Sequence, residues 1–273
     1  MKNAMSRLLA VLMAAVVCFT LASCGSKGLY EDLTVLETDL FESEDYAVAF
    51  RRGSDLAGML DTMLAEDFAS DKASETAAVY GLENSLVATF EKGTSAVTDT
   101  ADSSYVKNKG TLIVGVTVFD GMDYQDAEGN WIGFDADMAN RFAERLGVRA
   151  EFREINWDNK LVELASKSID CIWNGMTVTG EVSAACEVSG TYMKNGQVLV
   201  VKKGGIAAVS ELVGKQVAVE GGSAGYTQAT EKLSGVTVKE VTAQVDALLE
   251  VAAGTSDACV VDYVLARSLL DLE

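Results

Sequence analysis

Two kinds of apolar segment alternate along the chain from residue 110 onward. Runs rich in β-branched residues predict strands at 111–117, 149–155, 169–173, 215–219, 236–241 and 257–261. Between them, apolar residues recur at helical spacing. One predicted helix has Asp135 as its cap and carries Met138, Phe142 and Leu146 on one face. Further helices are predicted to start at Asp158, to span 223–233 and 243–253, and to end at residue 270. Repeated strand–helix units favour parallel sheets covered by helices, and the lone apolar strand at 197–202 separates two series, so we predict two α/β lobes.

The segment before residue 93 has a different pattern. It predicts short strands at 33–36 and 46–50, followed by helices at 55–64 and 72–80. Residues 93–110 are polar and rich in Ser, Thr and Asp, which predicts a flexible tether.

Residues 1–24 are typical of an export signal. Lys2 and Arg7 precede an apolar run that is too short for a membrane span, and small residues lead to Cys24. The ending Leu21-Ala22-Ser23-Cys24 resembles a bacterial lipobox, which implies cleavage before Cys24 and a lipid anchor on its thiol. An ordinary secretory signal that happens to contain a cysteine is the alternative.

Composition excludes several classes of function. The 273 residues carry 41 Asp+Glu against 22 Lys+Arg, and a net charge of −19 argues against a nucleic-acid partner. No histidine is present, so no Ser-His-Asp triad, Cys-His pair or His-ligated zinc site can form. Cys171, Cys186 and Cys259 show no metal-binding or disulfide spacing, and we expect no metal and no cofactor.

A long, ordered set of motifs resembles one protein family. The segments Gly129-Asn130-Trp131-Ile132-Gly133-Phe134-Asp135, Asn156-Trp157-Asp158, Asn174-Gly175-Met176-Thr177 and Gly196-Gln197-Val198-Leu199-Val200-Val201-Lys202 resemble the amino-acid-binding proteins of bacterial ABC importers, the extracellular solute-binding proteins of family 3. This resemblance implies a periplasmic-binding-protein type II fold, in which two α/β lobes joined by two hinge strands close over a ligand.

The order of these motifs differs from that of the family. The family's closing segment is missing after Asp262, whereas 45–54 resembles its second hinge strand and 56–82 its final helices. We therefore expect a circular permutation joined by the tether. The expected domains are a signal peptide at 1–24, part of lobe two at 28–44, lobe one at 45–198 and the rest of lobe two at 199–273. An unrelated helical domain before a truncated binding protein is the alternative.

The resemblance also implies a ligand site. Phe119 would cover the ligand's side chain, and Asn174, Gly175 and Thr177 would offer hydrogen bonds to the ligand. The start of the helix at Gly222 and Ser223 would face the ligand's carboxylate. Asp262 would hold its ammonium group. Ordinary roles compete with these: core packing for Phe119, a turn for Thr177 and a helix cap for Asp262.

One departure from the family bears on the ligand. Where the family carries an arginine that clamps an α-carboxylate, this chain has Val182. Asp120, Asp123, Glu220 and Asp262 are expected around the cleft, which favours a cationic or polar amino acid or a related amine.

Other classes of function are weaker. Gly221-Gly222-Ser223-Ala224-Gly225 matches the G-x-S-x-G nucleophile motif, but there is no histidine to activate Ser223. A dehydratase-like enzyme using Glu220 or Glu181 as acid, or a sensor lobe, remains as an alternative. We expect a monomeric, non-enzymatic, lipid-anchored protein on the cell surface or in the periplasm. It would bind a small amino acid or amine and deliver it to an ABC permease.

Overall fold

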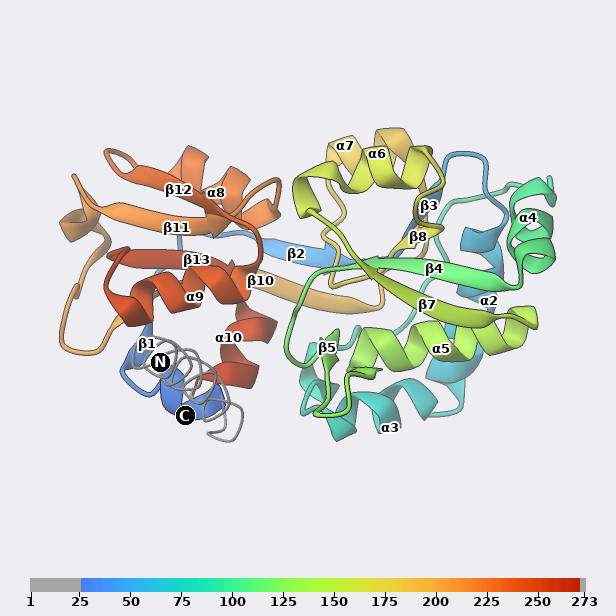
Figure 1. Cartoon of the computed structure of the whole chain (residues 1–273), viewed down its shortest axis with the longest axis horizontal. Coiled ribbons are helices and arrows are strands. Elements are labelled where there is room, and N and C mark those ends of the chain that lie inside the picture. The colour runs from blue at the N-terminus through green and yellow to red at the C-terminus, as the bar shows by residue number, and fades with distance from the viewer. Residues whose placement is uncertain (1–25, 271–273) are drawn as a thin grey trace, which may run out of the picture.

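The computed structural model describes residues 26–270, which form two α/β lobes side by side (Figure 1). Predictions on the export signal and on Cys24 fall outside the described residues. Each lobe is built on a mixed sheet, because the strands that run between the lobes are antiparallel to their neighbours while the others are parallel. The prediction of parallel sheets therefore holds only for the strands within each series.

The first lobe contains a five-stranded sheet. Its strand order is β7 (Arg149–Glu154), β4 (Thr111–Val116), β8 (Cys171–Ile172), β3 (Ala49–Arg51) and β9 (Cys186–Val188). A small hairpin of β5 (Tyr124–Gln125) and β6 (Trp131–Ile132) lies beside it. Its helices are α2 (Leu56–Ala69), α3 (Lys72–Val79), α4 (Ala101–Lys109), α5 (Phe134–Leu146), α6 (Lys160–Ala165) and α7 (Gly180–Ala185).

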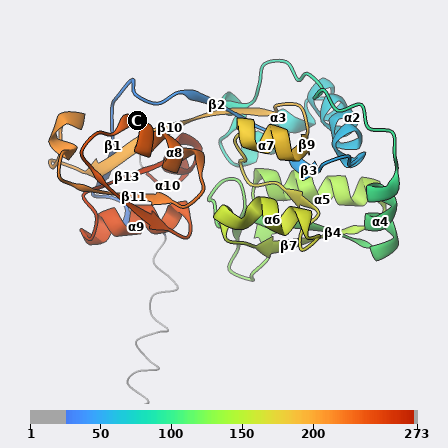
Figure 2. The ribbon, with the colours of Figure 1, turned by 90° about the horizontal axis from the view of Figure 1, so that it is seen from above.

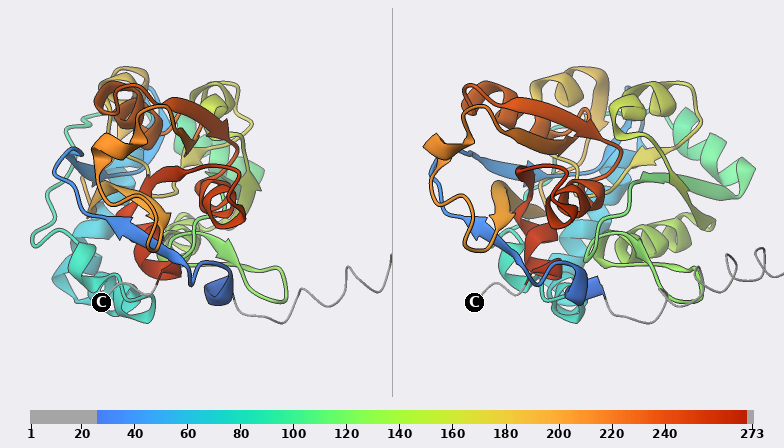
Figure 3. Two further views of the ribbon diagram at one scale, coloured as in Figure 1. Left: turned by 90° about the vertical axis from the view of Figure 1, so that its left-hand side faces the viewer. Right: turned by 60° about the vertical axis from the view of Figure 1, so that its left-hand side comes forward.

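The second lobe has the strand order β1 (Leu33–Leu36), β10 (Met193–Lys202), β13 (Ala258–Asp262), β11 (Gln216–Glu220) and β12 (Thr237–Val241). Seen from its end in Figure 3, β1 lies at one edge of this sheet. Helices α8 (Ala224–Lys232), α9 (Gln244–Ala253) and α10 (Tyr263–Leu269) follow β11, β12 and β13 in turn. Cys171, Cys186 and Cys259 are buried and free, and none of the described helices is long and apolar enough to span a membrane.

Two antiparallel strands connect the lobes. The first half of β10 pairs with β2 (Ser43–Tyr46), with Asn195 opposite Glu44, and its second half pairs with β1 and β13. The chain then leaves β2, breaks at Ala47–Val48 and enters the first-lobe sheet as β3, so the single strand predicted at 46–50 is wrong. The break follows from a change of partners, since the amide of Ala47 donates to Met176 O and that of Val48 to Ser189 Oγ.

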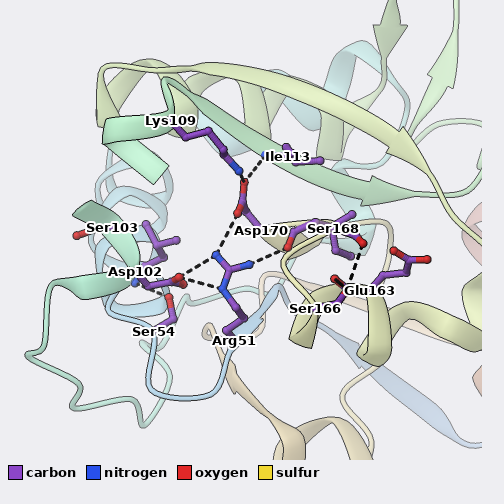
Figure 4. Close-up of polar contacts among 12 residues, drawn as sticks. Arg51, Ser54, Asp102, Ser103, Lys109, Ile113, Glu163, Ser166, Ser168 and Asp170 are labelled. Carbon is purple, nitrogen blue, oxygen red and sulfur yellow. Dashed lines mark hydrogen bonds and ion pairs between the residues drawn. The ribbon is translucent and has the colours of Figure 1, made fainter. Parts of the chain in front are cut away.

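The predicted tether is partly regular. Residues 101–109 form α4, while the stretch before it passes around the first lobe without regular structure (Figure 2). An ion-pair network holds α4 in place: Arg51 of β3 lies between Asp102 of α4 and the buried Asp170, and Lys109 also contacts Asp170 (Figure 4). The tether prediction is therefore wrong for 101–109.

Asp135 is not a helix cap, contrary to the sequence prediction. The cap position of α5 is Gly133, which has a φ of 125° and where an added methyl group would lie 2.2 Å from Met122 O, so no larger residue fits. The Asp135 carboxylate is instead fully buried and accepts hydrogen bonds from the Gly175 amide and the Tyr192 hydroxyl. It thus supports the loop that begins at Asn174.

Candidate functional site

A cavity of about 520 Å³ lies between the lobes. The first lobe contributes Trp157, Lys160 and the segment 174–179, and the second contributes Glu220, Gly222, Ser223, Gln228, Gln244 and Asp262. Residues 42–45, which run along the strand between the lobes, complete its wall. We call this the interlobe cavity.

Two acids enter the interlobe cavity from neighbouring parallel strands. Glu220 ends β11 and Asp262 ends β13, and these strands pair in parallel register. Ligands of open α/β sheets bind at such carboxyl ends. Both side chains are buried, with exposed fractions of 2% and 5%.

Amide groups surround Asp262. Its carboxylate accepts hydrogen bonds from the side chains of Asn195, Gln197 and Gln244, and its backbone amide donates to Gln244 Oε1 at 2.7 Å. Although Asp262 is the first residue before α10, its side chain makes no capping bond. Burial and the nearby Glu44 raise the pKa of Asp262 to about 7.

Glu44 is a third buried acid, and it comes from β2. Its carboxylate accepts bonds from Thr177 Oγ1 at 3.0 Å, from Gln228 Nε2 at 2.6 Å, and from Asn195 and Gln197. The same two amides therefore bridge Glu44 and Asp262. Among the described residues, Lys160 is the one Lys or Arg that lines the cavity.

Lys160 joins the two lobes at the cavity's edge. Its Nζ donates to Gly222 O at 2.8 Å and to Trp157 O at 3.2 Å, and it lies 5.0 Å from the centroid of the Trp157 ring. Burial lowers the pKa of Lys160, while Glu220, Glu181 and Asp158 oppose this shift. Three buried acids thus share the cavity with one partly buried lysine, and a cation that enters it would stabilise the ionised forms of these acids.

Known proteins resemble this chain over part of its length. Residues 112–207 match the family described as bacterial extracellular solute-binding proteins, family 3. A solved structure of ArgBP from T. maritima is 35% identical, with a TM-score of 0.58, over 61% of this chain and 74% of that one. The chain belongs to family 3 of the bacterial extracellular solute-binding proteins. It has the α/β type II periplasmic-binding-protein fold with two mixed sheets.

Curated relatives of this family 3 protein are named as binding proteins and not as enzymes. The L-cystine-binding protein TcyJ of Escherichia coli K12 is 31% identical over 169 residues, or 60% of this chain and 64% of that protein. The lysine/arginine/ornithine-binding periplasmic protein of the same organism is 29% identical over 172 residues, or 61% and 66%. The chain thus spans just under two thirds of the length of these relatives. Their non-enzymatic character agrees with the prediction that this chain is not an enzyme.

The structure brings six of the seven predicted ligand residues to the interlobe cavity: Asn174, Gly175, Thr177, Gly222, Ser223 and Asp262. Phe119 does not line it. This side chain is 2% exposed and packs behind Gly175, where an added methyl would come within 2.9 Å of its ring. Trp157 is the aromatic side chain that lines the cavity.

Several of these groups already have partners within the protein. The Asn174 side chain bonds Thr117 and Asp123, and the Thr177 hydroxyl donates to Glu44. Ser223 Oγ caps α8 by accepting from the Tyr226 amide, and it donates to Glu220 O, so none of its contacts is a base. This arrangement does not support a nucleophilic serine.

The acidic neighbourhood differs in part from the prediction. Glu220 and Asp262 line the cavity, whereas Asp120 and Asp123 do not. Glu44 and Lys160 were missed as site residues. Nothing in the local sequence pattern marks either residue, and Glu44 lies just outside the segment 45–54 that resembles a hinge strand. Among the described residues, no group of His, Cys, Asp and Glu is arranged to hold a metal ion.

Proposed function

We propose that this protein is the extracytoplasmic solute-binding component of an ABC importer, and that it binds a cationic amino acid or a related amine. The observation that carries this proposal is the meeting of Glu44, Glu220 and Asp262 in the interlobe cavity, where Lys160 is the one cationic neighbour among the described residues. Buried carboxylates without matched cations are costly, and a cationic ligand offsets that cost.

Asp262 is the proposed partner of the ligand's ammonium group. Three amide donors fix its carboxylate at the end of β13, so little reorganisation is needed when the ligand arrives. The segment 174–177 and the start of α8 at Gly222 and Ser223 would contribute further polar contacts. Relatives named for arginine or for lysine, arginine and ornithine support this class of ligand.

The proposal includes a circular permutation with the domain boundaries given above. Its support is that β1 and β2 pair with β10, β3 enters the first-lobe sheet, and the Tyr80 hydroxyl donates to Asp137 of α5. The segment 28–92 therefore contacts both lobes. A lipid anchor at Cys24, a position at the cell surface or in the periplasm, and delivery to a membrane permease complete the proposal.

Thermal unfolding in the presence of each amino acid and common polyamines tests this function. A ligand that binds the native state raises the unfolding midpoint by mass action. We expect a cationic amino acid or amine to raise it by several degrees and Asp262→Asn to abolish the shift. Asp257→Asn, at the opposite end of β13, is the control and should keep the shift. A folded sample that responds to none of these compounds would contradict the proposal.

A further inference from the structure

One carboxyl group of the interlobe cavity has an oxygen without a partner. Glu220 is 2% exposed, and its Oε1 is a buried atom that makes no hydrogen bond within the described part of the chain. The carboxylates of Glu44 and Asp262 differ, since each accepts several bonds from side-chain amides. Buried polar atoms are nearly always paired in native proteins, so an orphan on a side chain that lines a cavity points to a missing ligand atom.

Neighbouring charged side chains do not satisfy this oxygen. Lys160 is close enough to act on Glu220 electrostatically, but the two form no ion pair within the described residues, and the lysine amine is held by Gly222 O and Trp157 O. Asp262 and Asp246 add charge of the same sign. The parallel register that pairs Ala218 with Cys259 places Glu220 opposite Val261, one residue before Asp262, so both acids lie at the same end of neighbouring strands. Two buried acids that line one cavity repel each other when both are ionised, and a cation or a proton relieves that repulsion.

We propose that Glu220 is the specificity-determining residue of the site and selects ligands that carry a second, distal positive charge. This inference rests on the proposed function: Asp262 takes the ligand's α-ammonium group, and Glu220 takes an ammonium or guanidinium group at the far end of its side chain. A guanidinium donates through a fixed fork of N–H groups and would fill the vacant bond at Oε1. A neutral side chain of the same shape would leave the buried carboxyl unpaired.

A proton accompanies this selection. Burial, together with the charge of Asp262, raises the pKa of Glu220 to about 8, so the carboxyl holds a proton at neutral pH when the cavity is empty. An arriving cation favours the ionised form and displaces that proton into solvent. Binding of a dibasic ligand should therefore release protons, whereas a neutral analogue should release fewer.

Arginine and citrulline form the matched pair of ligands that tests the proposal, because they share shape and differ in the distal charge. Isothermal titration at pH 7 should show that the protein binds arginine at least about 30-fold more tightly than citrulline. Titrations in buffers of different ionisation enthalpy should show greater proton release for arginine. Glu220→Gln should reduce the preference to less than about threefold and remove the extra proton release. Each tenfold change corresponds to about 1.4 kcal/mol.

Glu240→Gln is the control variant. Glu240 lies opposite Val219 on the neighbouring strand β12, is exposed and does not line the cavity, so the variant makes the same substitution in the same sheet away from the site. Glu240→Gln should keep the preference for arginine over citrulline.

Two outcomes would overturn the role of Glu220 and leave the proposed function standing: equal binding of arginine and citrulline by the unaltered protein, or an unchanged preference in Glu220→Gln. Failure of every amino acid and amine to bind would overturn the proposed function as well. If Glu220→Gln does not fold, the proposal is tested by the unaltered protein alone, through the ratio of its affinities for arginine and citrulline and the protons released with each.

Discussion

Glu220 and Asp262 make the stability of the empty protein depend on pH. Burial raises the pKa of Glu220 from 4.5 to about 8 and that of Asp262 from 3.8 to about 7. The folded state therefore binds more protons than the unfolded state between about pH 4 and pH 8. Stability is greatest below the unfolded pKa values and is lost as pH rises through the folded ones.

Glu220→Gln should reduce this loss of stability. The amide cannot ionise, so the fall in the free energy of unfolding between pH 5 and pH 8 should be about 3 kcal/mol smaller than in the unaltered protein. A slope should remain, because burial also raises the pKa of Asp135 to about 7. Urea unfolding at pH 5, 6.5 and 8 without ligand measures the effect. An equally steep fall in the variant would mean that Glu220 is already ionised when the cavity is empty.

Among individual site residues, the sequence predicted those that lie within long motifs and missed those whose role depends on contacts distant along the chain. Asp262 and Ser223 were placed by their positions in segments that resemble those of the family. Glu44 was missed because its role depends on amides of β10, about 150 positions away. Phe119 was expected over the ligand, but aromatic side chains pack equally well behind a glycine, and local sequence does not separate these outcomes.

The two lobes approach each other closely at Gly222, a residue that lies between β11 and α8. It has a φ of 68°, and a methyl group there would lie 2.6 Å from Asp158 Cα in the other lobe. Together with the bond from Lys160 Nζ to Gly222 O, this close approach defines the closed edge of the cavity. Ligand affinity depends on how well the closed form is populated.

Gly222→Ala should therefore weaken ligand binding by about tenfold or more, because the methyl group strains the backbone and also separates the lobes. Gly204→Ala is the matched control: its φ is 70°, and a methyl there would meet nothing within 4 Å. Both variants should lose about 1 kcal/mol of stability from backbone strain, but only the first should lose affinity. Calorimetric titration with the ligand found by the thermal screen makes the comparison. Equal affinities would show that closure does not require this contact.

Elements with a strong apolar pattern were predicted well, and polar ones were not. The strands and helices predicted from 111 onward agree with the observed ranges to within a few residues, except that β8 is shorter and β10 extends back to Met193. The short elements β5, β6, α7 and β9 were not predicted. Helix α4 was missed because its nine residues bury only Ser103 and Val106, and its position depends on ion pairs with Arg51 and Asp170. Tertiary contacts of this kind have no local signature.

For the whole molecule, the question is whether residues 28–92 complete the two lobes or form an addition to them. The segment supplies β1 to one sheet, β3 to the other and β2 between them, and β2 carries Glu44 into the cavity. In a permuted protein the covalent link through the tether would be dispensable once the chain has folded. An added domain would instead leave residues 110–273 able to fold and bind alone.

Cleavage within the tether distinguishes these arrangements. A protease site inserted between Val97 and Thr98 avoids Gly93, which packs against Val188 and Ser189, and Thr100, the residue directly before α4. After cleavage, we expect the two fragments to stay together on size-exclusion chromatography and to keep the ligand-induced rise in unfolding midpoint. Residues 110–273 alone should show neither cooperative unfolding nor that rise, because β1, β2, β3 and one acid of the cavity are missing. If that fragment folds and binds with undiminished affinity, residues 28–92 are an accessory domain and the permutation is wrong.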